Sequence, residues 1–292
     1  MSAFSGLSAF PITPCDEAGR VDEAGLRRLL APLVEAGVDS IGLLGSTGTY
    51  AYLTRKERRR AVCIAADAVG NQVPLLVGIG ALRTDEAVRL AQDAKEAGAC
   101  AGLLAPVSYT PLTEDEVFVH FAAVAEEGGL PLVIYDNPAT THFRFTPALL
   151  GRLARLPGVV AAKCPGPAPE DAAATVTDLR DALPDGFPLG FSGDWNATEA
   201  MLAGGVAWYS VAAGLFPKPC LEIIRAVQAG DATRARALDA AMAPLWDLFK
   251  AHSSLRIVHA IAGAQPPRPI LPLPEDVQAQ ALATVRAMGL AA

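Results

Sequence analysis

The feature of this sequence that most limits its fold is a regular alternation of short apolar runs with longer amphipathic segments. Eight runs of four or five residues have the composition of buried strands, and the segments between them repeat apolar residues with a helical period. Parallel strands need long crossover connections, usually helices, so this alternation predicts a parallel α/β sheet. The expected strands are residues 7–10, 40–44, 74–78, 101–104, 132–135, 159–163, 188–192 and 207–211.

Eight strand–helix units within residues 1–225 favour a (β/α)8 TIM barrel over an open doubly wound sheet. The first strand–helix turn lacks the Gly-x-Gly-x-x-Gly pattern, so a dinucleotide-binding interpretation is weak. Two pairs have the spacing of a helical capping box, Thr54 with Glu57 and Thr113 with Glu116. The expected helices are residues 22–36, 54–69, 84–97, 113–127, 147–156, 169–183 and 195–203.

The pattern changes after residue 221, where only Ala-rich helical segments follow. We therefore expect two domains, a barrel of residues 1–225 and a small C-terminal helical appendage of residues 226–292. Packing, contact between subunits and covering of one barrel face are all open roles for the appendage. Its expected helices are residues 221–229, 231–250 and 275–288, with a proline-rich stretch at 265–274.

Composition argues against several classes of function. The 292 residues are 51% hydrophobic and 19% charged, enough for a large buried core, and a net charge of −7 disfavours a nucleic-acid partner. The basic run 55–60 is expected on a solvated face or a subunit contact. Apolar stretches such as 75–82 are too short to span a membrane. Five widely spaced cysteines predict reduced thiols in a cytoplasm, and no His, Asp or Glu set has metal-ligand spacing.

Lys163 is the most unusual residue of the expected strands. It ends the apolar run 159–163 and precedes Cys164-Pro165, which we do not expect to continue a strand. The sequence has only five lysines, so a general preference for lysine does not explain it. One interpretation is a side chain whose ammonium reaches solvent past its apolar stem. The other is a Schiff-base nucleophile, because burial disfavours the charged form of an amine.

Two further candidates lie at C-terminal strand ends, where barrel enzymes carry their active sites. Tyr135 closes the strand before that of Lys163, and neighbouring strands lie about 4.8 Å apart, so its phenol should reach a substrate bound to the lysine. The loop 45–48, with the sequence Gly-Ser-Thr-Gly, follows the second strand. Its backbone N–H groups could form a concavity for a carboxylate, although a generic tight turn also explains it.

These features occur together in one known family. The sequence resembles the N-acetylneuraminate lyase and dihydrodipicolinate synthase family of class I, Schiff-base-forming barrel enzymes. The resemblance covers almost the whole chain, and its motifs agree in order and spacing as a set. The motifs are Phe10-Pro11-Ile12-Thr13-Pro14, the loop 45–48, Tyr135-Asp136-Asn137-Pro138, Lys163, Ser192-Gly193-Asp194 and Gly204-Gly205.

The resemblance implies a mechanism and a set of site residues. Lys163 would attack the ketone of pyruvate or another short 2-oxo acid to form an imine, with Tyr135 as the proton shuttle. Ser46, Thr47 and Gly48 would hold the substrate carboxylate, and Thr47 would also pass protons to Tyr135. This chemistry needs neither a metal nor an organic cofactor. The implied partners are an aldehyde or sugar acid beside the 2-oxo acid, and further copies of the chain in a homodimer or homotetramer.

Thr140 departs from the family pattern at the second-substrate site. In dihydrodipicolinate synthases, the residue five places after the catalytic tyrosine is an arginine that grips the carboxylate of the aldehyde substrate. Threonine at this position argues against the lysine-biosynthesis reaction. His142 or Arg144 is expected either to substitute for the arginine or to lie on the surface.

Three other positions bear on the choice of substrate and on the proton relay. Tyr109 is the single tyrosine of a loop that often has a Tyr-Tyr pair in the family, where one tyrosine completes the proton relay of a neighbouring subunit. Thr49 stands where a glutamate is common. Asp194 is expected either to contact a polyhydroxylated substrate or to cap the helix that follows it.

The leading functional hypothesis is a Schiff-base aldolase or lyase that acts on pyruvate or another short 2-oxo acid. A second enzyme hypothesis keeps the lysine imine and uses it to dehydrate a deoxy-keto sugar acid. A hypothesis of another class is a catalytically silent, sugar-acid-binding barrel that has lost the relay. Product analysis separates the three hypotheses. The lyase gives an aldehyde plus pyruvate, the dehydratase removes water from an intact carbon chain, and the silent barrel shows no turnover.

Overall fold

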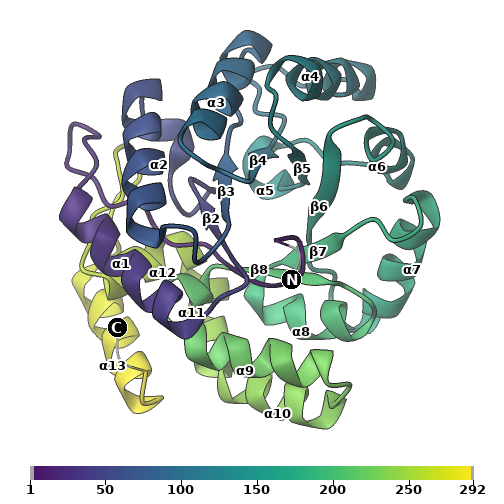
Figure 1. Ribbon diagram of the computed structural model, residues 1–292. Helices are drawn as coiled ribbons and strands as arrows, with labels where there is room; N and C mark the ends of the chain where they lie inside the picture. The colour runs from purple at the N-terminus through teal and green to yellow at the C-terminus, as the bar shows by residue number, and fades with distance from the viewer. Residues whose placement is uncertain (1–2, 291–292) are drawn as a thin grey trace.

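Eight parallel strands form a closed barrel, which confirms the TIM-barrel prediction (Figure 1). The computed structural model describes residues 3–290. The strands neighbour one another in chain order, and β1 pairs with β8 to close the ring. They are β1 (Gly6–Ala9), β2 (Ser40–Leu43), β3 (Leu75–Gly78), β4 (Ala101–Leu104), β5 (Leu132–Tyr135), β6 (Val159–Pro165), β7 (Leu189–Ser192) and β8 (Ala207–Ser210).

An outer layer of helices surrounds the strands, as Figure 1 shows. The helices of this layer are α1 (Glu23–Ala36), α2 (Arg55–Val69), α3 (Thr84–Glu96), α4 (Glu114–Glu127), α6 (Pro147–Leu153), α7 (Ala172–Ala182), α8 (Asp194–Leu202) and α9 (Pro217–Gln228). Three shorter pieces were not expected from the sequence: α5 (Pro138–Thr141) and the 3-10 turns η1 (Tyr50–Tyr52) and η3 (Ala212–Gly214). The helix expected over 169–183 begins as a 3-10 turn, η2 (Pro169–Asp171), and continues as α7.

Strand β6 runs two residues beyond Lys163, so the expectation that Cys164-Pro165 could not continue a strand was wrong. The backbone N–H groups of Ala162 and Gly166 bond to the β7 side, so those of the alternate residues face β5. Strand β5 ends at Tyr135, whose register partner is Lys163. At position 165, a backbone N–H would point beyond the last residue of β5. Proline, which has no N–H, therefore costs the sheet no hydrogen bond there.

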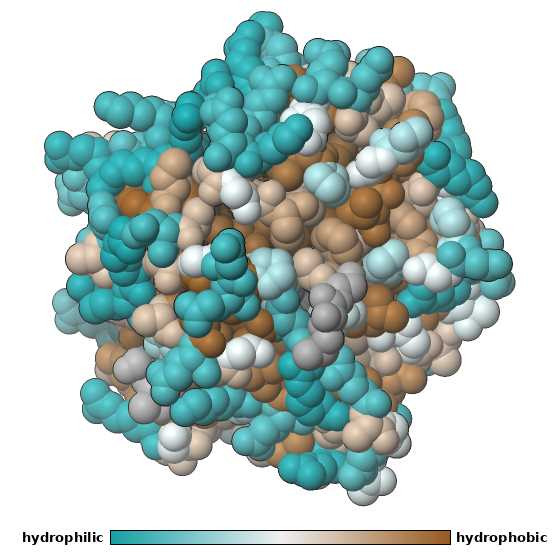
Figure 2. Space-filling model, in the orientation of Figure 1, coloured by the Kyte–Doolittle hydropathy of each residue, from teal (hydrophilic) through white to brown (hydrophobic). Residues whose placement is uncertain are grey.

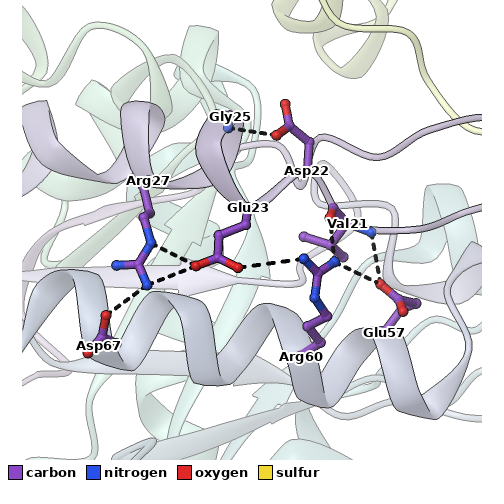
Figure 3. Close-up of polar contacts among 8 residues, drawn as sticks. All are labelled: Val21, Asp22, Glu23, Gly25, Arg27, Glu57, Arg60 and Asp67. Carbon is purple, nitrogen blue, oxygen red and sulfur yellow. Dashed lines mark hydrogen bonds and ion pairs between the residues drawn. The ribbon is translucent and has the colours of Figure 1, made fainter.

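Glu57 of α2 makes a different contact from the one that its capping-box spacing predicted. The Thr54 hydroxyl accepts a hydrogen bond from the Glu57 N–H at 3.3 Å, but the Glu57 carboxylate accepts from the Val21 N–H at 2.8 Å. Arg60 pairs with Glu57 and with Glu23 of α1, which joins the two helices (Figure 3). The predicted reciprocal box does form at Thr113, where α4 begins.

The C-terminal segment contains more helices than expected. They are α10 (Ala232–Ala241), α11 (Ala243–His252), α12 (Ser254–Ile261) and α13 (Glu275–Ala287). The single helix expected over 231–250 is broken at Met242, because Pro244 lies in the first turn of α11 and cannot continue a preceding helix. Helix α11 contacts α8 and α10, which ties the segment to the barrel. Helix α9 is continuous through residue 225, and the domain division there stays a prediction.

A small apolar cluster fills the barrel interior, separate from the main core between strands and helices. Phe10 and Tyr209 meet edge to face in it, with ring centres 5.9 Å apart. Gly42 makes room for Phe10, since a Cβ at Gly42 would lie 2.2 Å from the end of that ring. On the face that Figure 2 shows, hydrophilic side chains gather around the rim and apolar ones nearer the centre. Among residues 3–290, no helix has the length and apolar character to cross a membrane.

Candidate active site

Lys163 lies inside the barrel with 4% of its surface exposed. Its Nζ is 4.0 Å from the centre of the Tyr135 ring, 5.4 Å from that of Phe10 and 6.0 Å from that of Tyr209. Three aromatic rings therefore surround the amine. The sequence-based alternative of an ammonium that reaches solvent does not fit this burial.

The Tyr135 hydroxyl belongs to a closed triangle of hydrogen bonds. It lies 2.9 Å from Ser46 Oγ and accepts a hydrogen bond from Asn137 Nδ2 at 3.1 Å. Asn137 Nδ2 also donates to Ser46 Oγ at 2.9 Å. The register of β5 and β6 places Tyr135 directly beside Lys163, so the hydroxyl triangle and the amine share one end of the barrel.

The environment of Tyr135 makes its phenol more acidic than usual. Burial alone would raise the pKa of Tyr135, but the positive charge of Lys163 and the hydrogen bonds from Ser46 and Asn137 lower it below its ordinary value. A phenol with a lowered pKa beside a lysine is suited to exchange protons with a group bound to that lysine.

Loop 45–48 makes the turn after β2 and leaves two of its backbone donors free. The N–H groups of Thr47 and Gly48 have no backbone or side-chain acceptor among the described residues. A Cβ at Gly48 would lie 3.0 Å from both Leu44 Cα and Thr13 Oγ1, so the loop packs too closely for a larger residue. Ser46 is half-buried and Thr47 is buried. This arrangement can hold an anion such as a carboxylate.

A cavity of about 270 Å³ leads from Ser46 toward the C-terminal helices. It lies between the η1 turn, the α5 region and the junction of α11 with α12, and six of its lining residues are Ser46, Thr49, Tyr50, Thr140, Ser253 and Arg256. The junction of α11 and α12 thus forms one wall of the cavity beside Ser46, and the role of the whole C-terminal segment stays open.

Arg58 corrects the expectation for the basic run 55–60. It is buried, its guanidinium donates to the carbonyls of Gly78 at 2.8 Å and Gly80 at 3.0 Å, and it lies 5.1 Å from the centre of the Tyr50 ring. Burial lowers the pKa of Arg58 to about 10. This arginine therefore supports the ends of β3 and the wall of the cavity, while Arg55 is exposed.

Thr140 lines the cavity, but His142 and Arg144 are exposed residues that do not line it. The charge of Arg144 acts instead on the buried carboxyl of Asp136. Burial raises the pKa of Asp136 to about 6, although the charges of Arg144 and Lys163 oppose the increase.

Asp194 is 2% exposed and is held by β8 and η3. Its two carboxylate oxygens accept hydrogen bonds from Trp208 Nε1 at 3.0 Å and from the Ala212 N–H at 2.8 Å. The N-cap of α8 is Gly193, so Asp194 is not the cap that the sequence offered as an alternative. Burial raises the pKa of Asp194 to about 6, with the hydrogen bonds acting in the opposite direction.

Tyr109 is 95% exposed and lies outside the group around Lys163. Of the other expected residues, the structure brings Lys163, Tyr135 and Ser46 together, with Thr47 and Gly48 in the adjoining loop. No hydrogen bond joins Thr47 to Tyr135 among the described residues, where Ser46 makes that contact instead.

Asn137, Tyr50 and Arg256 were not predicted as site residues. Asn137 follows Tyr135 by two positions, so both side chains leave an extended segment on the same side, a signal that the sequence did contain. Nothing in the sequence indicated Arg256, because it reaches the cavity only through the packing of α12. Within residues 3–290, no group of three or more His, Cys, Asp or Glu side chains is arranged to hold a metal ion.

Comparison with known proteins gives one consistent result. The family model described as the dihydrodipicolinate synthetase family matches residues 3–288. The 4-hydroxy-tetrahydrodipicolinate synthase of Acidiphilium cryptum (strain JF-5) is 33% identical over 99% of this chain and 100% of its own length. The corresponding protein of Methylococcus capsulatus is 36% identical over 81% of this chain and 80% of its own.

Solved structures agree with the sequence comparison. The crystal structure of dihydrodipicolinate synthase from Agrobacterium tumefaciens str. C58 is 54% identical, with a TM-score of 0.95 and 98% of both chains covered. The crystal structure of dihydrodipicolinate synthase from Aquifex aeolicus is 26% identical, with a TM-score of 0.90 over 98% of both chains. The resemblance drawn from the sequence motifs is therefore confirmed, and the chain belongs to the dihydrodipicolinate synthetase family of carbon–carbon lyases.

Proposed function

We propose that this chain is a Schiff-base lyase that acts on pyruvate or another short 2-oxo acid. The observation that carries the proposal is the position of Lys163, buried in β6 beside the end of β5 with its Nζ 4.0 Å from the centre of the Tyr135 ring. A buried amine without an ion-pair partner among the described residues, next to a phenol of lowered pKa, is the arrangement that imine formation requires.

In the proposed mechanism, the neutral amine of Lys163 attacks the ketone carbon of the 2-oxo acid. Tyr135 delivers a proton to the oxygen of the resulting carbinolamine, which leaves as water as the C=N bond forms. The free N–H groups of Thr47 and Gly48 hold the carboxylate of the substrate. The protonated imine then withdraws electrons from the neighbouring carbon, which allows a C–C bond to form or to break there. The mechanism uses no metal and no organic cofactor.

The second substrate is an aldehyde or a sugar acid. The relatives are named for a synthase reaction, whereas Thr140 stands where the synthases have their aldehyde-gripping arginine. That this chain uses a different aldehyde stays a prediction. The dehydratase hypothesis and the silent-barrel hypothesis find no support in these comparisons.

We also propose a homodimer or homotetramer in the cytoplasm. The support for this is the family resemblance, in which a tyrosine of the loop after β4 reaches a neighbouring subunit, and Tyr109 on that loop is exposed. All five cysteines are free thiols, which is consistent with a reducing compartment. Sedimentation of the wild type and of Tyr109→Ala tests the assembly, and a wild-type monomer at micromolar concentration would contradict it.

Borohydride trapping tests the chemistry directly. The protein is incubated with pyruvate and with a panel of 2-oxo acids and deoxy-keto sugar acids, reduced with borohydride, digested and examined by mass spectrometry. A reduced adduct on the peptide that contains Lys163 is expected, since hydride converts the imine to a stable secondary amine. Lys163→Met should abolish it, and Lys218→Met, at an exposed lysine of α9, should leave it unchanged. Absence of any adduct on Lys163 across the whole panel would contradict the proposal.

A further inference from the structure

The cavity beside Ser46 ends at a cation that no other described group neutralises. Arg256 of α12 lines this cavity and is half-buried. Its Nη1 donates to the carbonyl oxygen of Leu271, and among residues 3–290 it forms no ion pair with a carboxylate. The rest of its guanidinium donors are therefore available to a ligand in the cavity.

The N-terminus of α12 lies at the same end of the cavity. Ser253, at the N-cap, and Leu255, in the first turn, both line it. The first backbone N–H groups of a helix have no partner within the helix, and no side chain caps this one. These donors and the positive end of the helix dipole favour an anion at this place.

Thr49 lies at the wall of the cavity but does not offer it a donor. The residue is 1% exposed, and its hydroxyl oxygen is buried without a hydrogen-bond partner among the described residues. A ligand in the cavity therefore meets Arg256 and the start of α12, and not this hydroxyl. Thr49 has a positive φ of 53°, which is uncommon for a threonine and fixes its position at the entrance of the η1 turn.

We infer that this end of the cavity is a distal carboxylate subsite, formed by Arg256 and the N-terminus of α12. The inference rests on the proposed function, because it concerns the substrate that Lys163 holds. The single positive charge of one guanidinium matches the single negative charge of one carboxylate. The site therefore fits a carboxylate better than a phosphate dianion. The substrate carbon chain extends from the imine past Ser46 and Tyr50 and carries a second carboxylate at its far end.

This subsite explains how the chain manages without an arginine at position 140. Thr140 lines the same cavity as Arg256, so the positive charge enters from the C-terminal segment instead of from the loop after β5. Arg144, the cation nearest to Thr140 in the sequence, is exposed and does not line the cavity. Specificity for the distal group is then a property of the contact between the barrel and α12.

A matched pair of probes tests the subsite. 2-Oxoadipate and 2-oxohexanoate have the same six-carbon chain and the same reactive ketone, but only the former ends in a carboxylate. For each, the concentration that gives half-maximal borohydride labelling of Lys163 is measured. We expect the wild type to require about tenfold less 2-oxoadipate than 2-oxohexanoate, because hydrogen bonds between charged groups are among the stronger ones.

Three variants assign this preference to residues. Arg256→Gln should remove it. Arg144→Gln removes a nearby cation outside the cavity, and Thr49→Val replaces a buried hydroxyl by a methyl group of similar size, so both variants should keep it. Labelling by pyruvate, which has no distal group, should be the same in all four proteins, and this control also shows that each variant is folded.

The outcomes separate the inference from the proposed function. Pyruvate labelling of Lys163 with equal half-saturation by the two six-carbon acids overturns the subsite and leaves the Schiff-base function standing. A preference that survives in Arg256→Gln and disappears in Arg144→Gln likewise overturns the assignment to Arg256. Failure of every 2-oxo acid to label Lys163 overturns the function, and the subsite with it.

Discussion

The Nζ of Lys163 lies 4.0 Å from the centre of the Tyr135 ring, and the two residues are register partners on β5 and β6. The ring contacts the amine, while its hydroxyl bonds Ser46 and Asn137. Tyr135 therefore has two separable functions. Its aromatic face shields the amine from water, and its hydroxyl is held by the hydrogen bonds with Ser46 and Asn137.

Tyr135→Phe separates these functions, because it keeps the ring and removes the hydroxyl. Turnover of a 2-oxo acid should fall about 10²- to 10⁴-fold, the usual contribution of a positioned proton donor, while Lys163 is still labelled on prolonged incubation. The control is Tyr209→Phe, which removes a buried hydroxyl that has no hydrogen-bond partner among the described residues. Full turnover by Tyr135→Phe would contradict the shuttle.

Ser46 and Thr47 should differ in their effect on the pH dependence of turnover. The hydrogen bond from Ser46 lowers the pKa of Tyr135, so Ser46→Ala should raise that pKa. The part of the pH–rate profile that the ionisation of Tyr135 controls should then move to higher pH. Thr47→Val keeps the backbone N–H that holds the carboxylate and removes a hydroxyl that does not bond Tyr135, so it should leave this part of the pH profile in place. Rate profiles of both variants over pH check this, and a shift in Thr47→Val alone would restore the relay expected from the sequence.

Asp136 should destabilise the protein at neutral pH. Burial raises its pKa from 3.8 to about 6, so between these values the folded state binds more protons than the unfolded one, and stability decreases as pH rises. A pKa raised to about 6 lowers the free energy of unfolding at pH 7 by up to about 3 kcal/mol. Asp136 Oδ1 has no hydrogen-bond partner among the described residues.

Asp136→Asn should therefore raise the free energy of unfolding at pH 7 by about 1–3 kcal/mol and flatten its dependence on pH between about 4 and 6. Urea unfolding of both proteins at several pH values measures this difference. Lower stability of the variant at pH 7 would show that the ionised carboxylate has a favourable contact instead.

Asp194→Asn should have the opposite effect, although burial raises the pKa of Asp194 to a similar value. Both carboxylate oxygens accept hydrogen bonds, so an amide would turn its NH2 group toward either Trp208 Nε1 or the Ala212 N–H. One buried donor would be left facing another, which should lower the free energy of unfolding by about 1–3 kcal/mol.

The same variant distinguishes a structural role of Asp194 from contact with substrate. With its oxygens bound to β8 and η3, we expect the half-saturating 2-oxo acid concentration for labelling Lys163 to stay within about twofold of wild type. A large change in that concentration, measured where the variant is fully folded, would support the substrate contact that the sequence analysis proposed.

Where sequence patterns failed, a competing tertiary contact explains the failure. The spacing of Thr54 and Glu57 predicted a capping box, but Glu57 finds the Val21 N–H of another loop within reach. The rule against proline in strands misjudged Pro165 because it takes no account of where the neighbouring strand ends. Helix α12 was not predicted, and it carries the cation that lines the cavity.

The sequence by itself determined the barrel and the pairing of Lys163 with Tyr135. Both depend on local patterns, because consecutive strands of a parallel barrel are neighbours and their ends meet at one face. Only the tertiary structure decided that Ser46 and not Thr47 bonds Tyr135, and that Arg256 reaches the mouth of the barrel. Those contacts join residues far apart in the chain, so they depend on loop conformation and helix packing that no short pattern encodes.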